Sequence, residues 1–246
     1  SEIPAALARA FFIARSGRPG PVLVDITKNA QLQQFDYEGY MPCEHIRSYR
    51  PKPIVRHKYV EQAAALINAA ERPYILFGQG VILGNAEREF RELVEKSGIP
   101  AAWTILGAGA LPTDHPLNVG MLGMHGNYGP NMLTNQCDVL IAIGMRFDDR
   151  VTGRLDRYAK QAKIIHLDID PAEIDKVLKV DVPVWGDCKE TLPLLTRLVQ
   201  PRTYPEWLSK FHDCTTQEQE TVIHNELHPV SETLTMGEVI KILNEL

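Results

Sequence analysis

The chain has 246 residues, of which 44% are hydrophobic and 23% are charged, and its formal net charge is −5. These proportions are ordinary for a globular protein of one large or two modest domains, and the slight acidity does not favour nucleic acid or an anionic membrane as a partner. No apolar run approaches the roughly 20 residues of a membrane span. The four cysteines lie far apart without a CxxC or Cys/His pattern, which predicts free thiols and neither disulfides nor zinc.

The first residues predict one helix and one strand. Apolar spacing over residues 3–14 is typical of an amphipathic helix rather than a signal peptide, and VLVDI at 22–26 is typical of a buried strand. One helix and one strand cannot bury their own apolar faces, so we expect them to end a domain that lies mostly outside this sequence. Residues 31–53 lack periodicity and carry three prolines, which predicts a linker.

Residues 54–200 alternate between helices and strands. A helix with Val60, Ala63, Ala64, Ile67 and Ala70 on one face comes first, and a short helix is expected at 130–136. The strands are nearly continuous apolar runs, so the pattern predicts the α/β class with a doubly wound, Rossmann-like parallel sheet. The predicted strands cover residues 73–78, 100–105, 139–144, 163–170 and 182–186.

Capping residues predict several helix ends in this region. Asn85 is expected to cap a helix that stops at Gly98. In DPAE, Asp170 is the expected cap, Pro171 fits the first helical position and Glu173 completes a capping box. Pro193 predicts a kink or a late start in the last helix of the unit.

The C-terminal part predicts little regular structure until its end. Residues 201–232 are polar and irregular, with Trp207 and Phe211 expected to pack a short helix. The final stretch TMGEVIKILNEL opens with a Thr235…Glu238 capping box and carries an apolar stripe. Both ends therefore resemble pieces of neighbouring domains, and the sequence is interpreted as a fragment.

Glycine-rich or polar segments follow the predicted strands, at the edge where parallel sheets bind ligands. Taken singly, each segment suits an ordinary turn: Gly78-x-Gly80-x3-Gly84 suits a tight turn, and GMRFDDRVTG at 144–153 suits a charged surface turn. Their shared location favours an extended dinucleotide-type ligand. No nucleophile arrangement or metal cluster is recognisable in the sequence, which predicts that the chain holds a cofactor rather than performing chemistry.

Five motifs together resemble the catalytic large subunits of the acetolactate synthase (acetohydroxyacid synthase) family, which use thiamine diphosphate. They are SGRPGPVLVDI (16–26), MLGMHG (121–126), GMRFDDRVTG (144–153), HLDIDPAEI (166–174) and WGD (185–187). The resemblance runs in order through the chain, and pyruvate oxidases match these strings less well. It implies a pyrimidine-binding domain ending at 1–30, a linker at 31–53, a central FAD-binding domain at 54–200, a linker at 201–234 and the start of a pyrophosphate-binding domain at 235–246.

The resemblance also implies an activity for the full-length enzyme. Such an enzyme condenses pyruvate with a second 2-oxo acid, pyruvate or 2-oxobutyrate, at the start of isoleucine and valine biosynthesis, and its FAD undergoes no net redox change. Thiamine diphosphate, Mg²⁺ and the catalytic glutamate would lie outside this sequence, so the fragment is expected to be inactive. A homodimer or homotetramer with a separate regulatory small subunit is implied, in the cytoplasm of a bacterium or in a plastid or mitochondrion of a eukaryote.

The resemblance assigns no catalytic or metal-binding residue to this chain, but it implies many FAD contacts. Two departures stand out: Thr27-Lys28-Asn29 replaces a PKD sequence, and GQG replaces a more glycine-rich version. A stand-alone dinucleotide-binding module and a pyruvate oxidase-like enzyme remain the alternatives. The implied FAD contacts are Arg18, Gly78, Gly80, Thr104, Ile105, Leu106, Leu122, Gly123, Met124, His125, Gly126, Gly144, Arg146, Asp148, Arg150, Val151, Asp168, Ile169, Glu173, Gly186, Asp187 and Cys188.

Overall fold

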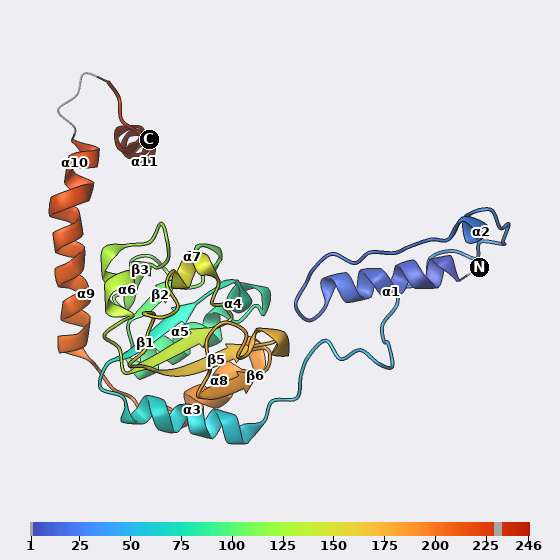
Figure 1. Cartoon of the computed structure of the whole chain (residues 1–246), viewed down its shortest axis with the longest axis horizontal. Coiled ribbons are helices and arrows are strands. Elements are labelled where there is room, and N and C mark those ends of the chain that lie inside the picture. Colours follow the sequence, from blue (N-terminus) through green and yellow to red (C-terminus); the bar gives the residue numbers. More distant parts are fainter. Residues whose placement is uncertain (1, 229–232) are drawn as a thin grey trace.

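The computed structural model describes residues 2–228 and 233–246 (Figure 1). Its centre is a six-stranded sheet in the order β3-β2-β1-β4-β5-β6, and all neighbouring strands are parallel. The predicted α/β class with a doubly wound parallel sheet is confirmed. Residue 1 of the predicted first segment and residues 229–232 of the predicted second linker lie outside the described residues. The strands are β1 (Pro73–Phe77), β2 (Ala101–Trp103), β3 (Asn118–Met121), β4 (Val139–Ile143), β5 (Lys163–Asp168) and β6 (Val182–Trp185).

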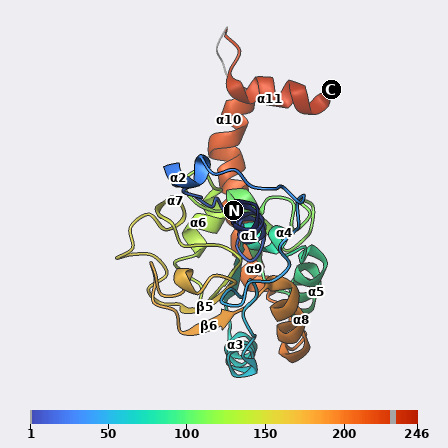
Figure 2. The same ribbon diagram turned by 90° about the vertical axis from the view of Figure 1, so that its right-hand side faces the viewer.

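Helices cover both faces of the sheet. Side chains alternate along a strand, so Tyr74 and Phe77 of β1 point to opposite faces. The Tyr74 ring lies 5.1 Å from the ring of Phe211, and the Phe77 ring lies 4.6 Å from that of Phe90. Because both faces are covered, β1 and β4 are buried at every residue, which explains their unbroken apolar sequences. Helices α3 (His57–Ala69), α5 (Glu87–Ser97) and α8 (Cys188–Leu198) form one group, and α6 (Tyr128–Leu133) and α9 (Pro205–Glu218) form the other (Figures 1 and 2).

Most of the N-terminal segment lies away from the sheet (Figure 1). Helix α1 (Ile3–Arg15) confirms the first predicted helix. The strand predicted at 22–26 is wrong: these residues form no regular structure, and Leu23 is 93% exposed. A parallel strand exists only through hydrogen bonds to its neighbours, and no described strand lies next to this segment. After α2 (Lys28–Gln31), residues 33–56 form neither helix nor strand.

Asn85, the end of α5 and strand β3 test the sequence predictions for the central region. Asn85 is not a helix cap, because it adopts a φ of +50° in the turn between α4 (Gln79–Leu83) and α5. The predicted end of α5 at Gly98, with a φ of +65°, is confirmed. Strand β3 was not predicted, since its residues are half-buried and include Gly120, so no apolar run marks it.

The predictions for the DPAE stretch and for Pro193 are only partly right. The Asp170 carboxylate accepts a hydrogen bond from the Ala172 N–H at 3.0 Å, as predicted. The Glu173 side chain does not complete a capping box, because it pairs with Arg18 instead. Helix α8 does not start late at Pro193: it begins at Cys188, where Asp187 caps it, and runs through the proline.

The predicted irregular stretch 201–232 is wrong over most of its described length. Helix α9 continues through a π-helical turn (Gln219–Ile223) into α10 (His224–Leu227). Trp207 and Phe211 are buried as predicted, and they fix the start of α9 against the sheet. The capping box of α11 (Met236–Glu245) is confirmed. None of the helices in the described residues is long and apolar enough to cross a membrane.

An ion pair between the buried Glu89 of α5 and the more exposed Lys189 of α8 gives a testable dependence of stability on pH. Glu89 accepts hydrogen bonds from Lys189 at 2.8 Å and from Arg88 at 2.9 Å. The bond from Lys189 is the main reason why the pKa of Glu89 falls from 4.5 to about 2. A lowered carboxylate pKa stabilises the folded state above the unfolded pKa, and this stabilisation is lost as the pH falls through the folded pKa.

We therefore expect Glu89→Gln to lower the free energy of unfolding by about 1–3 kcal/mol at pH 7, because the partners of the carboxylate lose their charged acceptor. The deficit should shrink between pH 4.5 and about 2, where wild-type Glu89 itself becomes protonated. Urea titrations at pH 7 and pH 3 measure both values, with the exposed Glu61→Gln on α3 as the control. A deficit of equal size at both pH values would contradict the expectation.

Candidate functional site

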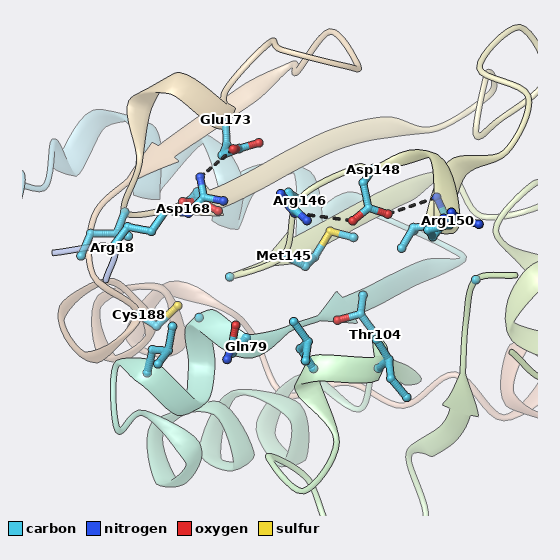
Figure 3. A pocket seen from close by; sticks show the side chains of 18 of the residues that line it. Arg18, Gln79, Thr104, Met145, Arg146, Asp148, Arg150, Asp168, Glu173 and Cys188 are labelled. Atoms are coloured by element: carbon cyan, nitrogen blue, oxygen red, sulfur yellow. Dashed lines mark hydrogen bonds and ion pairs between the residues drawn. The ribbon is translucent and has the colours of Figure 1, made fainter. Parts of the chain in front are cut away.

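A cavity of about 540 Å³ lies at the carboxyl ends of the central strands (Figure 3). Residues that follow β1, β2, β4 and β5 contribute its walls, and the N-terminal segment contributes Gly17, Arg18 and Pro19. This is the edge at which open parallel sheets bind ligands. The volume falls within the range of about 300–1,000 Å³ that is usual for small-molecule sites.

Most of the residues expected at a cofactor site line this one cavity. Three of the expected residues, Gly78, Gly126 and Gly186, are not in its lining. The structure thus gathers segments that are up to 170 positions apart, from Arg18 to Cys188, around a single volume. Their contact with a cofactor stays a prediction. The expected cofactor contacts that do line the cavity are Arg18, Gly80, Thr104, Ile105, Leu106, Leu122, Gly123, Met124, His125, Gly144, Arg146, Asp148, Arg150, Val151, Asp168, Ile169, Glu173, Asp187 and Cys188.

The three glycines outside the lining are required for packing behind it. A Cβ at Gly78 would lie 2.6 Å from the Cβ of Met145, and one at Gly186 would lie 2.5 Å from a methyl group of Thr191. A Cβ at Gly126 would lie 2.6 Å from the backbone carbon of Leu122. These distances are far below van der Waals contact, so each glycine permits a close backbone approach.

Several lining residues were not predicted. Gly17, Pro19, Gln79, Gly84 and Met121 lie within or beside the motifs of the sequence analysis, so their neighbourhood was the available signal. Leu83 and Met145 also lie within these motifs, in Gly78-x-Gly80-x3-Gly84 and in GMRFDDRVTG, and their place in the cavity depends on the short helix α4 and on the direction in which the chain leaves β4.

Two glycines bring the ends of β1 and β4 together beneath the cavity. The Gly80 N–H donates to the Gly144 carbonyl at 2.8 Å. A Cβ on Gly80 would lie 2.5 Å from the Gly144 Cα, and Gly144 has a φ of +57°. Backbone therefore packs directly against backbone here, which leaves the space above it for a ligand.

The segment after β4 places two arginines along one wall, as Figure 3 shows. Asp148 accepts a hydrogen bond from the Arg150 N–H at 3.2 Å and so caps the short helix α7 (Asp149–Thr152). Its other oxygen lies 3.5 Å from Nε of Arg146. Asp148, rather than Asp149, is thus the aspartate that orients an arginine. The Arg146 side chain is still 58% exposed, so its terminal nitrogens can reach a ligand.

Arg18 closes one end of the cavity from the N-terminal segment. Its guanidinium lies 2.8 Å from Asp170 and 2.6 Å from Glu173. Hydrogen bonds to Glu173 and then to Asp170 raise the pKa of Arg18. Tyr49 fixes the turn that carries Arg18, since its hydroxyl donates to the Ser16 carbonyl at 3.1 Å.

Asp168 lies at the same end and is largely buried. One of its oxygens accepts a hydrogen bond from the Asp170 N–H at 2.8 Å. The other lies 3.7 Å from Nε2 of His166, which in turn contacts the Met145 carbonyl at 2.9 Å. Burial raises the pKa of Asp168 and lowers that of His166. A neutral His166 ring that donates to Met145 leaves Asp168 able to accept a hydrogen bond from a ligand.

The opposite end of the cavity is apolar. Ile105, Leu106 and Met124 line it and are more than half exposed, although they are large hydrophobic residues. Thr104 and Arg150 lie at this end in Figure 3, whereas Asp168 and Cys188 lie at the other. The cavity therefore runs from carboxylates paired with Arg18, past Arg146, to an apolar surface beside Arg150.

Comparisons with known proteins agree with this architecture. The family model described as "Thiamine pyrophosphate enzyme, central domain" matches residues 60–195. A probable acetolactate synthase large subunit of Methanocaldococcus jannaschii is 45% identical over 217 residues, which are 86% of this chain and 37% of that protein. The acetolactate synthase large subunit of Corynebacterium glutamicum is 47% identical over 195 residues, which are 79% of this chain and 31% of that protein.

A solved structure is also similar. An X-ray structure of a putative thiamin diphosphate-dependent enzyme from Mycobacterium smegmatis superposes with a TM-score of 0.63 at 25% identity, over 81% of this chain and 38% of that one. The chain spans about a third of the length of the curated relatives that it matches. The similarity thus covers most of this chain and only part of each relative.

Proposed function

Because the chain belongs to the thiamine pyrophosphate enzyme family, whose central domain it contains, we propose that its cavity holds FAD within an acetolactate synthase large subunit. The observation that carries this proposal is the change along the cavity from charged to apolar lining residues. FAD combines ribose hydroxyls, an anionic pyrophosphate and a broad flat ring system. Each of these parts has a suitable wall in the chain.

The charged end suits the adenosine half of FAD. Carboxylates at strand ends accept hydrogen bonds from ribose hydroxyls, and Asp168 and Asp187, which line this end, would take that role. Arg146 and Arg150 lie farther along the wall, where planar guanidinium groups can bind a pyrophosphate.

The apolar end suits the flavin ring. Ile105, Leu106 and Met124 are exposed to water, and together they form an apolar surface on which a flavin ring can pack. The FAD would serve there as a structural cofactor without net redox change, as the resemblance implies. The chain's own contribution is to bind it, orient it and keep water from its ring.

The whole-protein activity forms part of the same proposal. The complete protein would condense pyruvate with a second 2-oxo acid, pyruvate or 2-oxobutyrate, using thiamine diphosphate and Mg²⁺ bound outside this chain, in a cytoplasmic homodimer or homotetramer. The name "large subunit" of the relatives supports a small regulatory partner. The family match at 60–195 supports a central domain at 54–200, with 1–30 and 235–246 assigned to the neighbouring domains and 31–53 and 201–234 to linkers.

A flavin titration tests the proposal on this chain. We expect saturable quenching of flavin fluorescence at micromolar FAD. Arg146→Ala is expected to weaken binding about tenfold, because it removes a charge-assisted hydrogen bond. The matched control is Arg157→Ala, an exposed arginine outside the cavity. An absent flavin signal, or equal affinities for the two variants, would argue against the proposed site.

Two further measurements separate the alternatives. A stand-alone dinucleotide-binding module would bind NAD as well as FAD, whereas the apolar end of the cavity favours FAD. For the complete protein, release of acetolactate from pyruvate supports the proposal, and release of acetyl phosphate supports a pyruvate oxidase-like enzyme.

A further inference from the structure

One wall of the cavity is a loop at residues 120–127, here named the glycine loop. Its members Leu122, Gly123 and Met124 line the cavity. The loop contains no regular structure after β3, so side chains from outside the cavity hold it. The amide group of Asn131 spans Gly123, with hydrogen bonds of 2.9 Å to both its N–H and its carbonyl.

Asn127 holds the other end of the glycine loop. Its side-chain oxygen accepts a hydrogen bond from the Met121 N–H at 3.0 Å. Gly120, with a φ of +104°, leaves the space for this contact, since a Cβ there would lie 2.5 Å from the same oxygen. Asn127 stands at the N-cap position of α6, yet its side chain does not cap that helix. The Asn127 side chain, which would usually cap α6, binds the loop instead.

Glu218 supplies the missing cap from a distant part of the chain. One carboxylate oxygen accepts a hydrogen bond from the Tyr128 N–H at 3.0 Å, and the other accepts one from the amide of Asn127 at 3.1 Å. Glu218 is half-buried and is the last residue of α9, 91 positions after Asn127. It therefore fixes both the start of α6 and the amide that shapes the glycine loop.

The position of Glu218 connects this wall to the C-terminal part of the chain. Helix α9 is anchored at its start, where Trp207 donates to the Pro73 carbonyl at 2.9 Å. Immediately after Glu218 the backbone changes to the π-helical turn that leads to α10. In Figure 1 α9 runs alongside α6 and then leads away from the sheet toward α11. Glu218, at the end of α9, is thus bonded to the cavity wall on one side and continuous with the C-terminal helices on the other.

We propose that Glu218 is a positioning residue, which sets the conformation of the glycine loop through Asn127 and thereby makes the flavin affinity depend on the placement of α9. The proposal rests on FAD as the occupant of the cavity. A displacement of the C-terminal helices that moves Glu218 removes one hydrogen bond from Asn127 in the loop and one from Tyr128 at the start of α6, and so weakens cofactor binding.

This role is tested by exchanging the hydrogen-bond donor and acceptor between Glu218 and Asn127. Glu218→Gln leaves one acceptor oxygen for two donors, the Asn127 amide and the Tyr128 N–H, and Asn127→Asp places two carboxylates against each other. Glu218→Gln therefore loses one of its two hydrogen bonds, and Asn127→Asp loses the bond that now measures 3.1 Å. The double variant restores it, because the carboxylate introduced at position 127 accepts from the amide introduced at position 218 and still accepts from the Met121 N–H. The exposed Glu220→Gln is the control with the same loss of charge.

Two readouts on the 246-residue chain decide the outcome. Each single variant should weaken FAD binding about fivefold to tenfold relative to Glu220→Gln, and the double variant should recover most of that loss. Without FAD, hydrogen exchange of the Met121 and Tyr128 amides should accelerate in the single variants and recover in the double variant.

The outcomes separate the two proposals. Unchanged amide exchange in both single variants would overturn the role of Glu218, whatever the flavin result. Altered exchange with rescue, but no flavin binding in the wild type, would support the positioning contact and overturn FAD as the occupant. Losses in both single variants without rescue in the double variant would also overturn the proposed pairing.

Discussion

Adding one methyl group at Gly144 is expected to abolish FAD retention and to lower the free energy of unfolding by about 3 kcal/mol. The new Cβ would lie 2.7 Å from the Gly80 Cα and 2.9 Å from the Val81 nitrogen. These are backbone atoms, which cannot rotate away as a side chain does. The φ of +57° adds conformational strain, because residues with a Cβ rarely adopt it. Urea unfolding and flavin titration measure the two effects.

Two companion variants separate crowding from strain. Gly80→Ala introduces only crowding, since its Cβ would lie 2.5 Å from the Gly144 Cα and its own φ is not in the left-handed region. Gly153→Ala introduces only strain, since its φ is +55° and nothing lies within 4 Å of the added carbon. Gly80→Ala should lose FAD as Gly144→Ala does, and Gly153→Ala should keep it. Normal flavin affinity in Gly80→Ala would show that the glycine contact does not shape the cavity.

The central sheet could be predicted because its strands are buried on both faces. An unbroken apolar run of about five residues, such as that of β1 or β4, is typical of a strand covered by helices on both sides. Strand β3 escaped prediction for the opposite reason: it lies at the edge of the sheet, is half-buried and contains a glycine. The segment at 22–26 has the composition of a strand, but no described neighbour pairs with it, and pairing rather than composition makes a strand.

The location of the candidate site could be predicted more fully than its contacts. The carboxyl ends of parallel strands lie at the same edge of the sheet, regardless of the loops that connect them. Gly80, Gly144 and Asp168 are therefore expected close together. The pairing of Arg18 with Glu173 joins residues 155 positions apart across an irregular segment. No local pattern encodes such a contact, and the same holds for Glu218 and Asn127. In each case the chain path, rather than the residue type, determines the partner.

Removing the Arg18 charge is expected to weaken FAD binding about 100-fold at pH 8. Three carboxylates, those of Asp168, Asp170 and Glu173, gather at this end of the cavity, and Arg18 pairs with two of them. Arg18→Met keeps much of the side-chain volume but leaves these carboxylates opposed mainly by Lys176, which lies 2.9 Å from Glu173. An anionic ligand would then approach an excess of negative charge. The matched control is Arg15→Met, an exposed arginine on the same segment outside the cavity.

The pH dependence distinguishes this charge effect from a loss of packing. Burial alone would raise the pKa of Glu173, but the hydrogen bonds from Arg18 and Lys176 outweigh it and lower that pKa. Without Arg18 the pKa of Glu173 rises, so its negative charge is lost at a higher pH than in the wild type. The 100-fold deficit should therefore be smaller at pH 5 than at pH 8, because Glu173 is neutralised at a higher pH in Arg18→Met than in the wild type. A deficit of constant size would mean that Arg18 acts by closing the cavity, because packing does not titrate in that range.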